Sequence, residues 1–389
     1  TPSLESRYNA ERGKYGHLLL PERIQQRPMP KVELIDMRQE FLETRQQATF
    51  SRALVAGVQE RLESHEQAML LLNRRGFASF VACRACGERV QCTNCSVTLT
   101  FHRRDRRMLC HLCNYAEKVP TRCPKCDSEQ IQFLGVGSER VEQELHDAFP
   151  TARVARLDRD TVGAKRDFET ILAGFRDHKY DLLVGTQMIA KGHDIPNVTL
   201  VGIVNADIGL GLPDFRAAER TFQLLTQAAG RAGRAERSAD APPAQVWIQT
   251  RHPDHALFDA LKRHDYPGFA EQQLQERLTA GMPPYTHQAL LRAEARQMSD
   301  ALAFLDAARS AGLHGAGEVI TLYPPVPMAM QKVANAERAQ MLVEATHRGA
   351  LQQFLSAWSA ALHTTRAQHK RRSEEHTSEL QSRGLISYA

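Results

Sequence analysis

Residues 181–205 read DLLVGTQMIAKGHDIPNVTLVGIVN and hold two strand-like segments joined by a more polar loop. The first segment, Asp181–Gly185, ends at a turn that begins with Thr186. The second, Val198–Asn205, is apolar at almost every position. A strand without polar alternation is expected to be covered on both faces, as in parallel sheets with helices on either side. This stretch therefore predicts the interior of a parallel sheet.

Strands and helices alternate on both sides of this stretch, which is the pattern of an α/β fold. The alternation is expected to begin with a strand at Ile131–Leu134 and a helix at Ser138–Phe149, for which Ser138 is the N-cap. The remaining expected elements are strands at Val154–Leu157 and Gln245–Gln249 and helices at Asp167–Phe175 and Phe215–Ala229.

The segments outside this alternation suggest further domains. Residues 1–35 look like the end of a preceding domain, and one charged, helix-prone segment runs from Asp36 to about Glu66. A strand is expected at Met69–Leu72. Beyond Gly281 a mixture of strands and helices predicts a small separate α+β domain, in which Trp358 lies on the apolar face of the last helix and is expected in the core.

Composition narrows the class of protein. The chain has 389 residues with 42% hydrophobic and 24% charged residues, an ordinary globular balance. No apolar run approaches the length of a membrane-spanning helix. The net charge of +5 is compatible with nucleic-acid binding without demonstrating it. Because the sequence starts Thr1-Pro2-Ser3 without Met or an export signal, it is expected to be a cut from a longer cytoplasmic protein.

All eight cysteines lie in one short segment and form four C-x-x-C pairs. Without an export signal, such pairs favour metal thiolates over disulfides, and zinc over an iron–sulfur cluster or redox pairs. Two C-x-x-C turns complete one tetrahedral Cys₄ site, so eight ligands predict two structural Zn²⁺ ions. The expected ligands are Cys83, Cys86, Cys92, Cys95, Cys110, Cys113, Cys123 and Cys126.

The spacing leaves the pairing of the cysteines open. Only 14 residues separate Cys95 from Cys110, just short of the common ribbon spacing. This favours a nested arrangement, in which the middle two pairs share one ion and the outer two pairs share the other. An interleaved cross-brace is the alternative.

The cysteine segment also carries basic residues, nine Lys/Arg against three acidic side chains. Two Zn(Cys⁻)₄ centres would offset most of this excess. The cluster His102–Arg107, on the loop between the inner pairs, is expected to contact phosphate or a protein.

A second motif, QAAGRAGR at Gln227–Arg234, closes a predicted helix. Together with Thr186 and the G-x-D-x-P of Gly192–Pro196, it resembles the second motor lobe of superfamily 2 helicases. In such motors ATP lies between two α/β lobes, and the second lobe supplies arginines to the γ-phosphate. A guanidinium suits this role because it remains charged and donates two parallel hydrogen bonds to phosphate.

The resemblance implies a role for each matching residue. Arg234 would be the arginine finger, Arg231 a phosphate or inter-lobe contact, and Gln227 an orienting group in the cleft. Gly192 and Asp194 would lie beside the nucleotide. The implied contacts to the DNA backbone are Thr186, Ser138 and Arg140, the last two at the start of a helix.

An eight-cysteine insertion inside the second lobe, preceded by Leu72-Asn73-Arg74-Arg75-Gly76, resembles the primosomal protein N′ (PriA) family of replication-restart helicases. Asn205-Ala206-Asp207, Tyr323-Pro324-Pro325 and the motif from Pro213 to Arg220 fit the same family. The family resemblance implies the nested zinc pairing, with Cys83, Cys86, Cys123 and Cys126 on one ion and Cys92, Cys95, Cys110 and Cys113 on the other.

The sequence also departs from a complete motor. It holds no G-x-x-x-x-G-K-[ST] and no D-E-x-H. The first lobe is therefore expected to have been lost upstream, and residues from about 372 resemble a translated sequencing adapter.

The resemblance implies that residues 1–65 are the end of lobe 1 and a connector, and that residues 66–82 and 127–280 form lobe 2. Residues 83–126 would be the zinc insertion and residues 281–371 the C-terminal domain. Residues 372–389 would be an adapter-derived tail. The complete protein would be a monomeric ATP- and Mg²⁺-dependent 3′→5′ DNA helicase of the bacterial cytoplasm and nucleoid. It would act on stalled forks, bind branched and single-stranded DNA, primosome proteins and single-stranded DNA-binding protein, and promote primosome assembly.

Two alternatives compete with this interpretation. The chain could be a zinc-dependent DNA or protein docking module with a degenerate motor lobe, for which Arg234 would be dispensable. A redox or iron–sulfur protein would instead be coloured.

Overall fold

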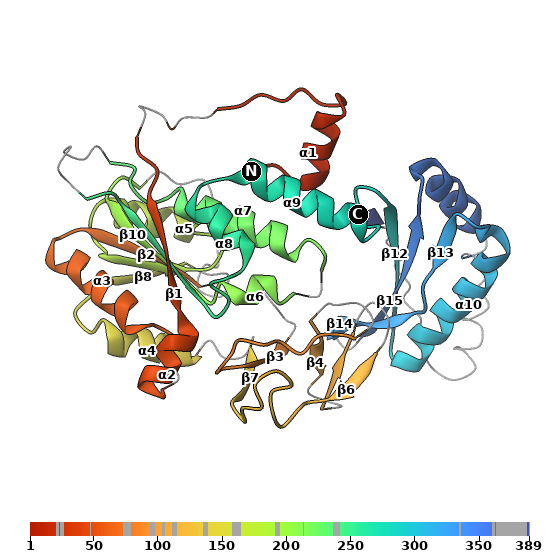
Figure 1. Ribbon diagram of the computed structural model, residues 1–389, viewed down its shortest axis with the longest axis horizontal. Coiled ribbons are helices and arrows are strands. Elements are labelled where there is room, and N and C mark those ends of the chain that lie inside the picture. The colour runs from red at the N-terminus through yellow and green to blue at the C-terminus, as the bar shows by residue number, and fades with distance from the viewer. Residues whose placement is uncertain are drawn as a thin grey trace. The chain divides into compact units, whose positions relative to one another are not determined.

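Six parallel strands form the central sheet, in the order β1-β11-β10-β2-β9-β8 (Figure 1). Their bounds are β1 Lys31–Asp36, β2 Gln67–Leu72, β8 Val154–Leu157, β9 Leu182–Gly185, β10 Val198–Val204 and β11 Gln245–Thr250. The computed structural model describes residues 1–20, 23, 27–46, 48–72, 79–93, 98–102, 106–110, 115–134, 139–157, 165–190, 195–212, 214–235, 242–333, 336–359, 362, 387 and 388.

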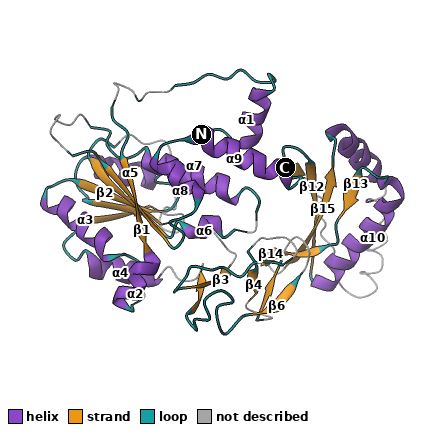
Figure 2. Ribbon diagram, viewed as in Figure 1, coloured by secondary structure: helices purple, strands orange, loops and turns teal. Residues whose placement is uncertain are grey.

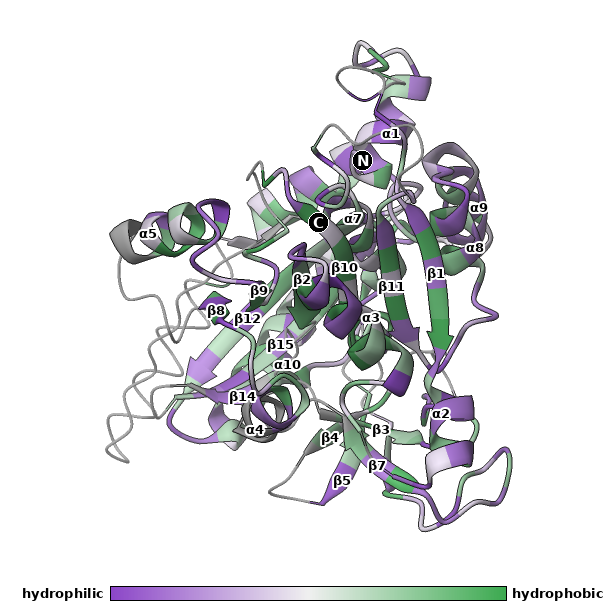
Figure 3. Cartoon of the chain, turned by 90° about the vertical axis from the view of Figure 1, so that its left-hand side faces the viewer, coloured by the Kyte–Doolittle hydropathy of each residue, from purple (hydrophilic) through white to green (hydrophobic). Residues whose placement is uncertain are grey.

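The central strands are buried on both faces. In β2, Met69 and Leu71 belong to one hydrophobic cluster, whereas Ala68 and Leu70 belong to another. Because successive side chains of a strand point to opposite faces, these clusters lie on the two sides of the sheet. Hydrophobic strands lie at the centre of the lobe in the hydropathy view (Figure 3). The expected doubly covered parallel sheet is confirmed.

Different helices cover the two faces of the sheet. Side chains of α3 (Arg52–Glu63) and α4 (Glu139–Ala148) belong to one cluster. The opposite cluster includes residues of α5 (Lys165–Arg176), α7 (Ala217–Ala229) and α8 (Ala256–Lys262). In α7 the aromatic ring of Phe222 stacks on Phe269 of α9 (Tyr266–Thr279), with ring centroids 4.1 Å apart.

The sheet begins earlier in the chain than expected. Residues 31–36 form β1, which pairs with β11 along its whole length, so this segment belongs to the same lobe rather than to residues that precede it. The helix-prone segment from Asp36 to about Glu66 is helical in two parts. Two helices, α2 (Met37–Thr44) and α3, are separated by a corner at which Ser51 caps α3 by accepting a hydrogen bond from Leu54 N–H.

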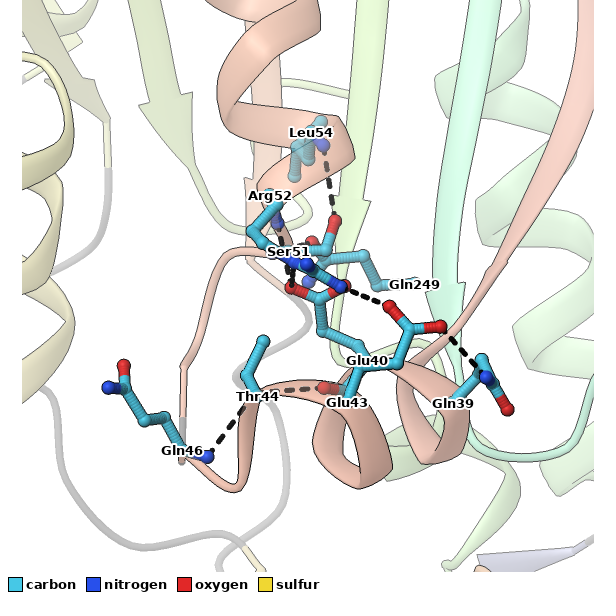
Figure 4. A network of polar contacts seen from close by, with 9 residues as sticks. All are labelled: Gln39, Glu40, Glu43, Thr44, Gln46, Ser51, Arg52, Leu54 and Gln249. Atoms are coloured by element: carbon cyan, nitrogen blue, oxygen red, sulfur yellow. Dashed lines mark hydrogen bonds and ion pairs between the residues drawn. The ribbon is translucent and has the colours of Figure 1, made fainter.

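A polar network fastens this corner to the sheet (Figure 4). Buried Gln249 of β11 accepts a hydrogen bond from Ser51 N–H at 2.7 Å and donates one to the carbonyl of Thr49 at 2.7 Å. At the surface, the Arg52 side chain bonds Glu40 at 3.1 Å and also reaches Glu43. One glutamine therefore satisfies the backbone on the N-terminal side of α3.

The cysteine segment opens and closes with an antiparallel pair, β3 (Ser79–Cys83) and β7 (Ile131–Leu134). The expectation that Ile131–Leu134 begins the parallel alternation is therefore wrong, because this strand pairs Cys83 with Ile131 at the base of the insertion. An added Cβ at Gly211 would meet the Phe80 ring of β3 at 2.5 Å, which shows how closely this base packs on the lobe.

Gly87, directly after the first cysteine pair, makes a second close contact with the lobe. Its φ is +80°, and an added Cβ would lie 2.7 Å from the carbonyl oxygen of Arg251, just beyond β11. Buried Asp207, in α6 (Asp207–Leu210), fixes the end of β11 by accepting hydrogen bonds from Thr250 Oγ1 at 2.5 Å and from Arg251 N–H at 2.8 Å. The base of the insertion is thus seated on the carboxyl ends of β10 and β11.

The middle of the insertion contains three short antiparallel strands, β4 (Thr100–His102), β5 (Arg107–Leu109) and β6 (Ala116–Lys118). Leu99 and Met108 are fully buried in this part of the insertion.

The C-terminal segment forms a second, antiparallel sheet, as expected for an α+β domain (Figure 2). β12 (His287–Ala295) pairs with β15 (Ala336–Ala345), which also pairs with β13 (Ile320–Leu322) and β14 (Val326–Val333). Alternate residues of β12 and β15 are buried under α10 (Met298–Ala316) and a helix at 348–359. Trp358 lies in this core, as expected, and donates to the carbonyl of Ala308 at 3.0 Å.

Two terminal elements complete the description. In α1 (Leu4–Glu11), Glu5 lies 3.5 Å from buried Arg277 of α9, and Tyr8 packs edge-on against Tyr285. The short β16 (Ser387–Tyr388) pairs with β12, while the rest of the tail from 372 lies outside the described residues. In the described ranges, no helix has the length and apolarity needed to cross a membrane.

Replacing Gln249 with Ala should lower the free energy of unfolding by about 1–3 kcal/mol, because the buried N–H of Ser51 and the carbonyl of Thr49 would lose their partner. Urea unfolding followed by circular dichroism measures this loss. The control is Arg52→Ala, which removes exposed ion pairs of the same network and should cost less than about 1 kcal/mol. Equal losses for the two variants would contradict this account.

Gly87→Ala should destabilise the lobe through both its positive φ and the overlap with the Arg251 carbonyl. Gly13 is the matched control, since its φ is +73° and an added Cβ would meet nothing within 4 Å. Both alanines carry backbone strain of about 1–2 kcal/mol. We therefore expect Gly87→Ala to cost about 1–3 kcal/mol more than Gly13→Ala in urea unfolding of the metal-loaded chain. The same cost for both would mean that the contact with Arg251 is unimportant.

Candidate functional site

Four cysteine sulfurs from the two ends of the insertion converge. The Sγ atoms of Cys83, Cys86, Cys123 and Cys126 all lie within 4.8 Å of one another. Cys83 and Cys126 are 3.6 Å apart, as are Cys86 and Cys123. A disulfide needs about 2.05 Å, whereas a tetrahedron with Zn–S bonds of about 2.3 Å separates its sulfurs by about 3.8 Å. The arrangement fits a four-coordinate zinc ion.

The backbone around these cysteines follows one repeated pattern. Cys83 N–H donates to the carbonyl of Glu88, and Gly87 N–H donates back to the carbonyl of Cys83. Cys123 N–H donates to Ser128 and Asp127 N–H to Cys123 in the same way. Gly87 and Asp127, which follow the two second cysteines, both have positive φ. Each C-x-x-C turn therefore presents two sulfurs on one side.

Burial raises the pKa of the Cys83 and Cys86 thiols. A thiol in such surroundings binds metal as thiolate, so metal binding releases its proton. The donor set consists of sulfur alone, which is typical of structural zinc sites without an open position for water.

The inner pairs are described only in part. Cys92 and Cys110 are buried, and Cys110 N–H donates to the carbonyl of Tyr115, repeating the contact of the outer turns. Cys95 and Cys113 lie outside the described residues. The structure therefore groups the outer four cysteines, as in one half of the nested arrangement.

Only the ends of the basic cluster can be placed. His102 pairs with Arg107 across β4 and β5, and the side chains of Arg106 and Arg107 are exposed. Arg103 to Asp105 lie outside the described residues. The described arginines are thus accessible to a phosphate or a partner.

The arginine-rich motif forms a turn at the end of α7. Gly230 closes the helix, and Gly233 N–H donates to the carbonyl of Val198 at 2.9 Å, which attaches the turn to the amino end of β10. Ala228 and Ala232 are buried, whereas Gln227 is exposed. The motif is therefore anchored through its small residues, and its polar residues lie closer to solvent.

The two arginines of this turn bond the turn's own backbone. Arg234 Nε donates to the carbonyl of Gly230 at 2.8 Å, and Arg231 Nε lies 3.4 Å from the carbonyl of Gln227. Both side chains are partly exposed. Their guanidinium groups are held near the helix end and can donate to an anion there.

Sequence reasoning missed two further arginines at this turn, Arg23 and Arg27. Arg23 bonds carbonyls of the turn, and Arg27 donates to the carbonyl of Arg234. Burial lowers the pKa of Arg23, and the charges of Arg234 and Arg27 lower it further. Residues 1–35 carried no motif that pointed to this contact.

The remaining expected residues lie elsewhere or cannot be placed. Thr186 follows β9, where its N–H donates to the carbonyl of Leu157 at 3.3 Å, so it lies at the carboxyl end of the sheet. The arginine-rich turn lies at the amino end. Gly192, Asp194 and Ser138 are outside the described residues. Arg140 lies in the first turn of α4, and its side chain is also outside them.

Three family profiles match parts of the chain. Residues 92–118 match the PriA DNA helicase Cys-rich region domain, residues 122–236 the helicase conserved C-terminal domain, and residues 279–377 the primosomal protein N C-terminal domain. The Cys-rich match and the four converging sulfurs together support zinc binding.

Curated relatives give the same result over most of the chain. Replication restart protein PriA of Bacillus subtilis is 46% identical over 301 residues, covering 77% of this chain and 37% of the relative. Its namesakes in Synechocystis and Haemophilus influenzae are 39% and 38% identical, covering 88% and 93% of this chain and 42% and 48% of the relatives. The chain thus spans less than half the length of these relatives. It belongs to the PriA family of replication restart proteins and carries that family's Cys-rich region and C-terminal domain together with a helicase C-terminal lobe.

Proposed function

We propose that this chain supplies the second motor lobe, the zinc module and the C-terminal domain of an ATP-dependent 3′→5′ DNA helicase. The whole protein would remodel stalled replication forks and promote primosome assembly. The observation that carries this proposal is the turn after α7, where Arg231 and Arg234 project from a buried, sheet-anchored backbone. Such rigid placement suits an arginine that must meet a γ-phosphate.

The opposite positions of the two motifs support separate roles. The arginine-rich turn and Val198, four residues after Asp194, meet at the amino end of β10. We assign this end, with Gln227, to ATP and its Mg²⁺, and we propose that Gly192 and Asp194 also bind the nucleotide. The carboxyl end of β9, with Thr186, is assigned to the DNA backbone, and Ser138 and Arg140 are proposed to join it. Because the sequence has no G-x-x-x-x-G-K-[ST], we expect no ATP hydrolysis by this chain alone.

The zinc module is proposed to hold two structural ions in the nested pairing, and to support strand separation and docking. The proposed partners are branched and single-stranded DNA, primosome proteins and single-stranded DNA-binding protein, with the protein acting as a monomer in the cytoplasm and nucleoid. Residues 83–126 and 281–371 are proposed as the zinc insertion and the C-terminal domain, and residues from 372 as an adapter-derived tail.

The motor proposal is tested by fusing the chain to the part of the Bacillus subtilis relative that the match leaves uncovered, and measuring ATP hydrolysis with and without single-stranded DNA. We expect DNA to stimulate turnover. Arg234→Ala should lower kcat by on the order of 10³-fold, as expected for a lost arginine finger.

Arg176→Ala is the control, because it removes an exposed arginine of α5 in the same lobe and should leave kcat unchanged. If Arg234→Ala left kcat of the active fusion unchanged, the lobe would be a scaffold and the docking-module alternative would be favoured.

The zinc pairing is tested with double serine variants of this chain, whose metal content is measured by elemental analysis. The wild-type chain should hold two zinc equivalents and be colourless. In the nested pairing, Cys86→Ser with Cys123→Ser disables one site and leaves one equivalent. Cys86→Ser with Cys110→Ser disables both sites and leaves none.

The cross-brace predicts the reverse pattern for the two double variants, since Cys86 and Cys110 would then share an ion. Its observation would overturn the nested pairing while leaving the zinc assignment intact. Iron together with visible absorbance would overturn the zinc assignment itself.

A further inference from the structure

Arg23 lies 207 residues before the turn that follows α7, and its side chain bonds three backbone carbonyls of that turn. Its Nη2 donates to the carbonyls of Gly230 at 3.1 Å and Ala232 at 3.2 Å, and its Nη1 lies 3.4 Å from the carbonyl of Gly233. Nη1 also donates to the carbonyl of Pro28 at 3.0 Å, in its own segment. One guanidinium thus joins a residue that precedes β1 to the end of α7.

These carbonyls belong to the part of a helix that needs external donors. The last carbonyls of a helix have no partner within it, and a cation there also interacts favourably with the helix dipole. The N–H groups of Gly230 and Ala232 bond back to Thr226 and Ala229 of α7. A planar guanidinium with five donors can bond several such carbonyls at once, which a lysine cannot do with the same geometry.

Arg23 and Arg234 are linked through a shared acceptor. Arg234 Nε donates to the carbonyl of Gly230, and Arg23 Nη2 donates to the same oxygen. A second residue of the same segment, Arg27, donates to the carbonyl of Arg234. The segment before β1 therefore contacts both the side-chain acceptor and the backbone of the proposed arginine finger.

The positive charges gathered at this turn favour the binding of an anion. Arg23, Arg27 and Arg234 lie close enough for the charges of the latter two to act on Arg23. Like charges held together repel one another, and an arriving phosphate would relieve that repulsion. The arrangement therefore suits a turn that binds a phosphate.

We propose that Arg23 is a positioning residue: it clamps the turn Gly230–Gly233 and thereby holds Arg231 and Arg234 in place for the nucleotide. This inference rests on the proposed motor function for its catalytic consequence. Its structural part, the clamp on the turn, concerns this chain alone and can be tested separately.

The clamp is tested first in the 389-residue chain by hydrogen exchange of the amides from Arg231 to Arg234. Arg23→Gln should accelerate their exchange by roughly tenfold or more, since each tenfold change corresponds to about 1.4 kcal/mol, the scale of one hydrogen bond to a charged group. The control is Arg309→Gln, which removes an arginine bond to the carbonyl of Leu322 in the C-terminal domain and should leave these amides unchanged. Unchanged exchange in Arg23→Gln would overturn the clamp.

The catalytic consequence is tested in the fused protein by a double-mutant cycle. Arg23→Gln should lower kcat by roughly 10- to 10²-fold, the scale expected for a misplaced group. In the Arg234→Ala background it should cause little further loss, because its effect passes through Arg234.

A purely structural role would lower kcat by the same factor in both backgrounds, and this result would overturn the positioning role. If the unmutated fusion showed no DNA-stimulated hydrolysis, the motor proposal would fail, whereas the exchange measurement would still decide the clamp.

Discussion

Burial of β10 on both faces is the constraint on which the rest of the lobe depends. All seven of its residues are buried, and the strand lies between β2 and β11 in the sheet. A strand covered in this way needs a helix layer on each side, which α3 and α7 provide. Since α7 returns from the carboxyl end to the amino end of the sheet, its last turn meets the start of β10 at Val198. The position of the arginine-rich turn follows from the path of the chain around this strand.

The cysteine insertion, at the other end of the sheet, has too few residues for a large hydrophobic core of its own. Its strands β4, β5 and β6 have only three residues each, too few to enclose a large core. Metal ligation supplies the missing folding energy in modules of this size. The outer cysteines lie next to the antiparallel pair of β3 and β7, and this base packs on the lobe through Phe80 and Gly87. The four outer cysteines and the arginine-rich turn are therefore fixed to opposite ends of one sheet.

Much of this could be predicted locally. The run from Val198 to Asn205 identified a doubly buried strand, and the C-x-x-C spacing identified candidate metal ligands, because both signals lie within a few residues. The sequence indicated a helix-prone segment from Asp36 to about Glu66 but not the break within it. The helix α2 ends at Thr44, where Arg45 takes a left-handed conformation, and α3 starts at the Ser51 cap. Ser51 is held there by buried Gln249 of β11, almost 200 residues away.

The sequence by itself indicated the candidate metal-binding and phosphate-binding residues and most segments of the doubly covered sheet, since spacing and apolar runs are properties of neighbouring residues. Tertiary structure decided three further features. It paired residues 31–36 with β11, it turned Ile131–Leu134 into the antiparallel partner of β3, and it brought Arg23 to the end of α7. Each of these joins segments distant along the chain, and neither backbone pairing between distant strands nor an arginine bond to distant carbonyls leaves a mark in the local sequence of either partner.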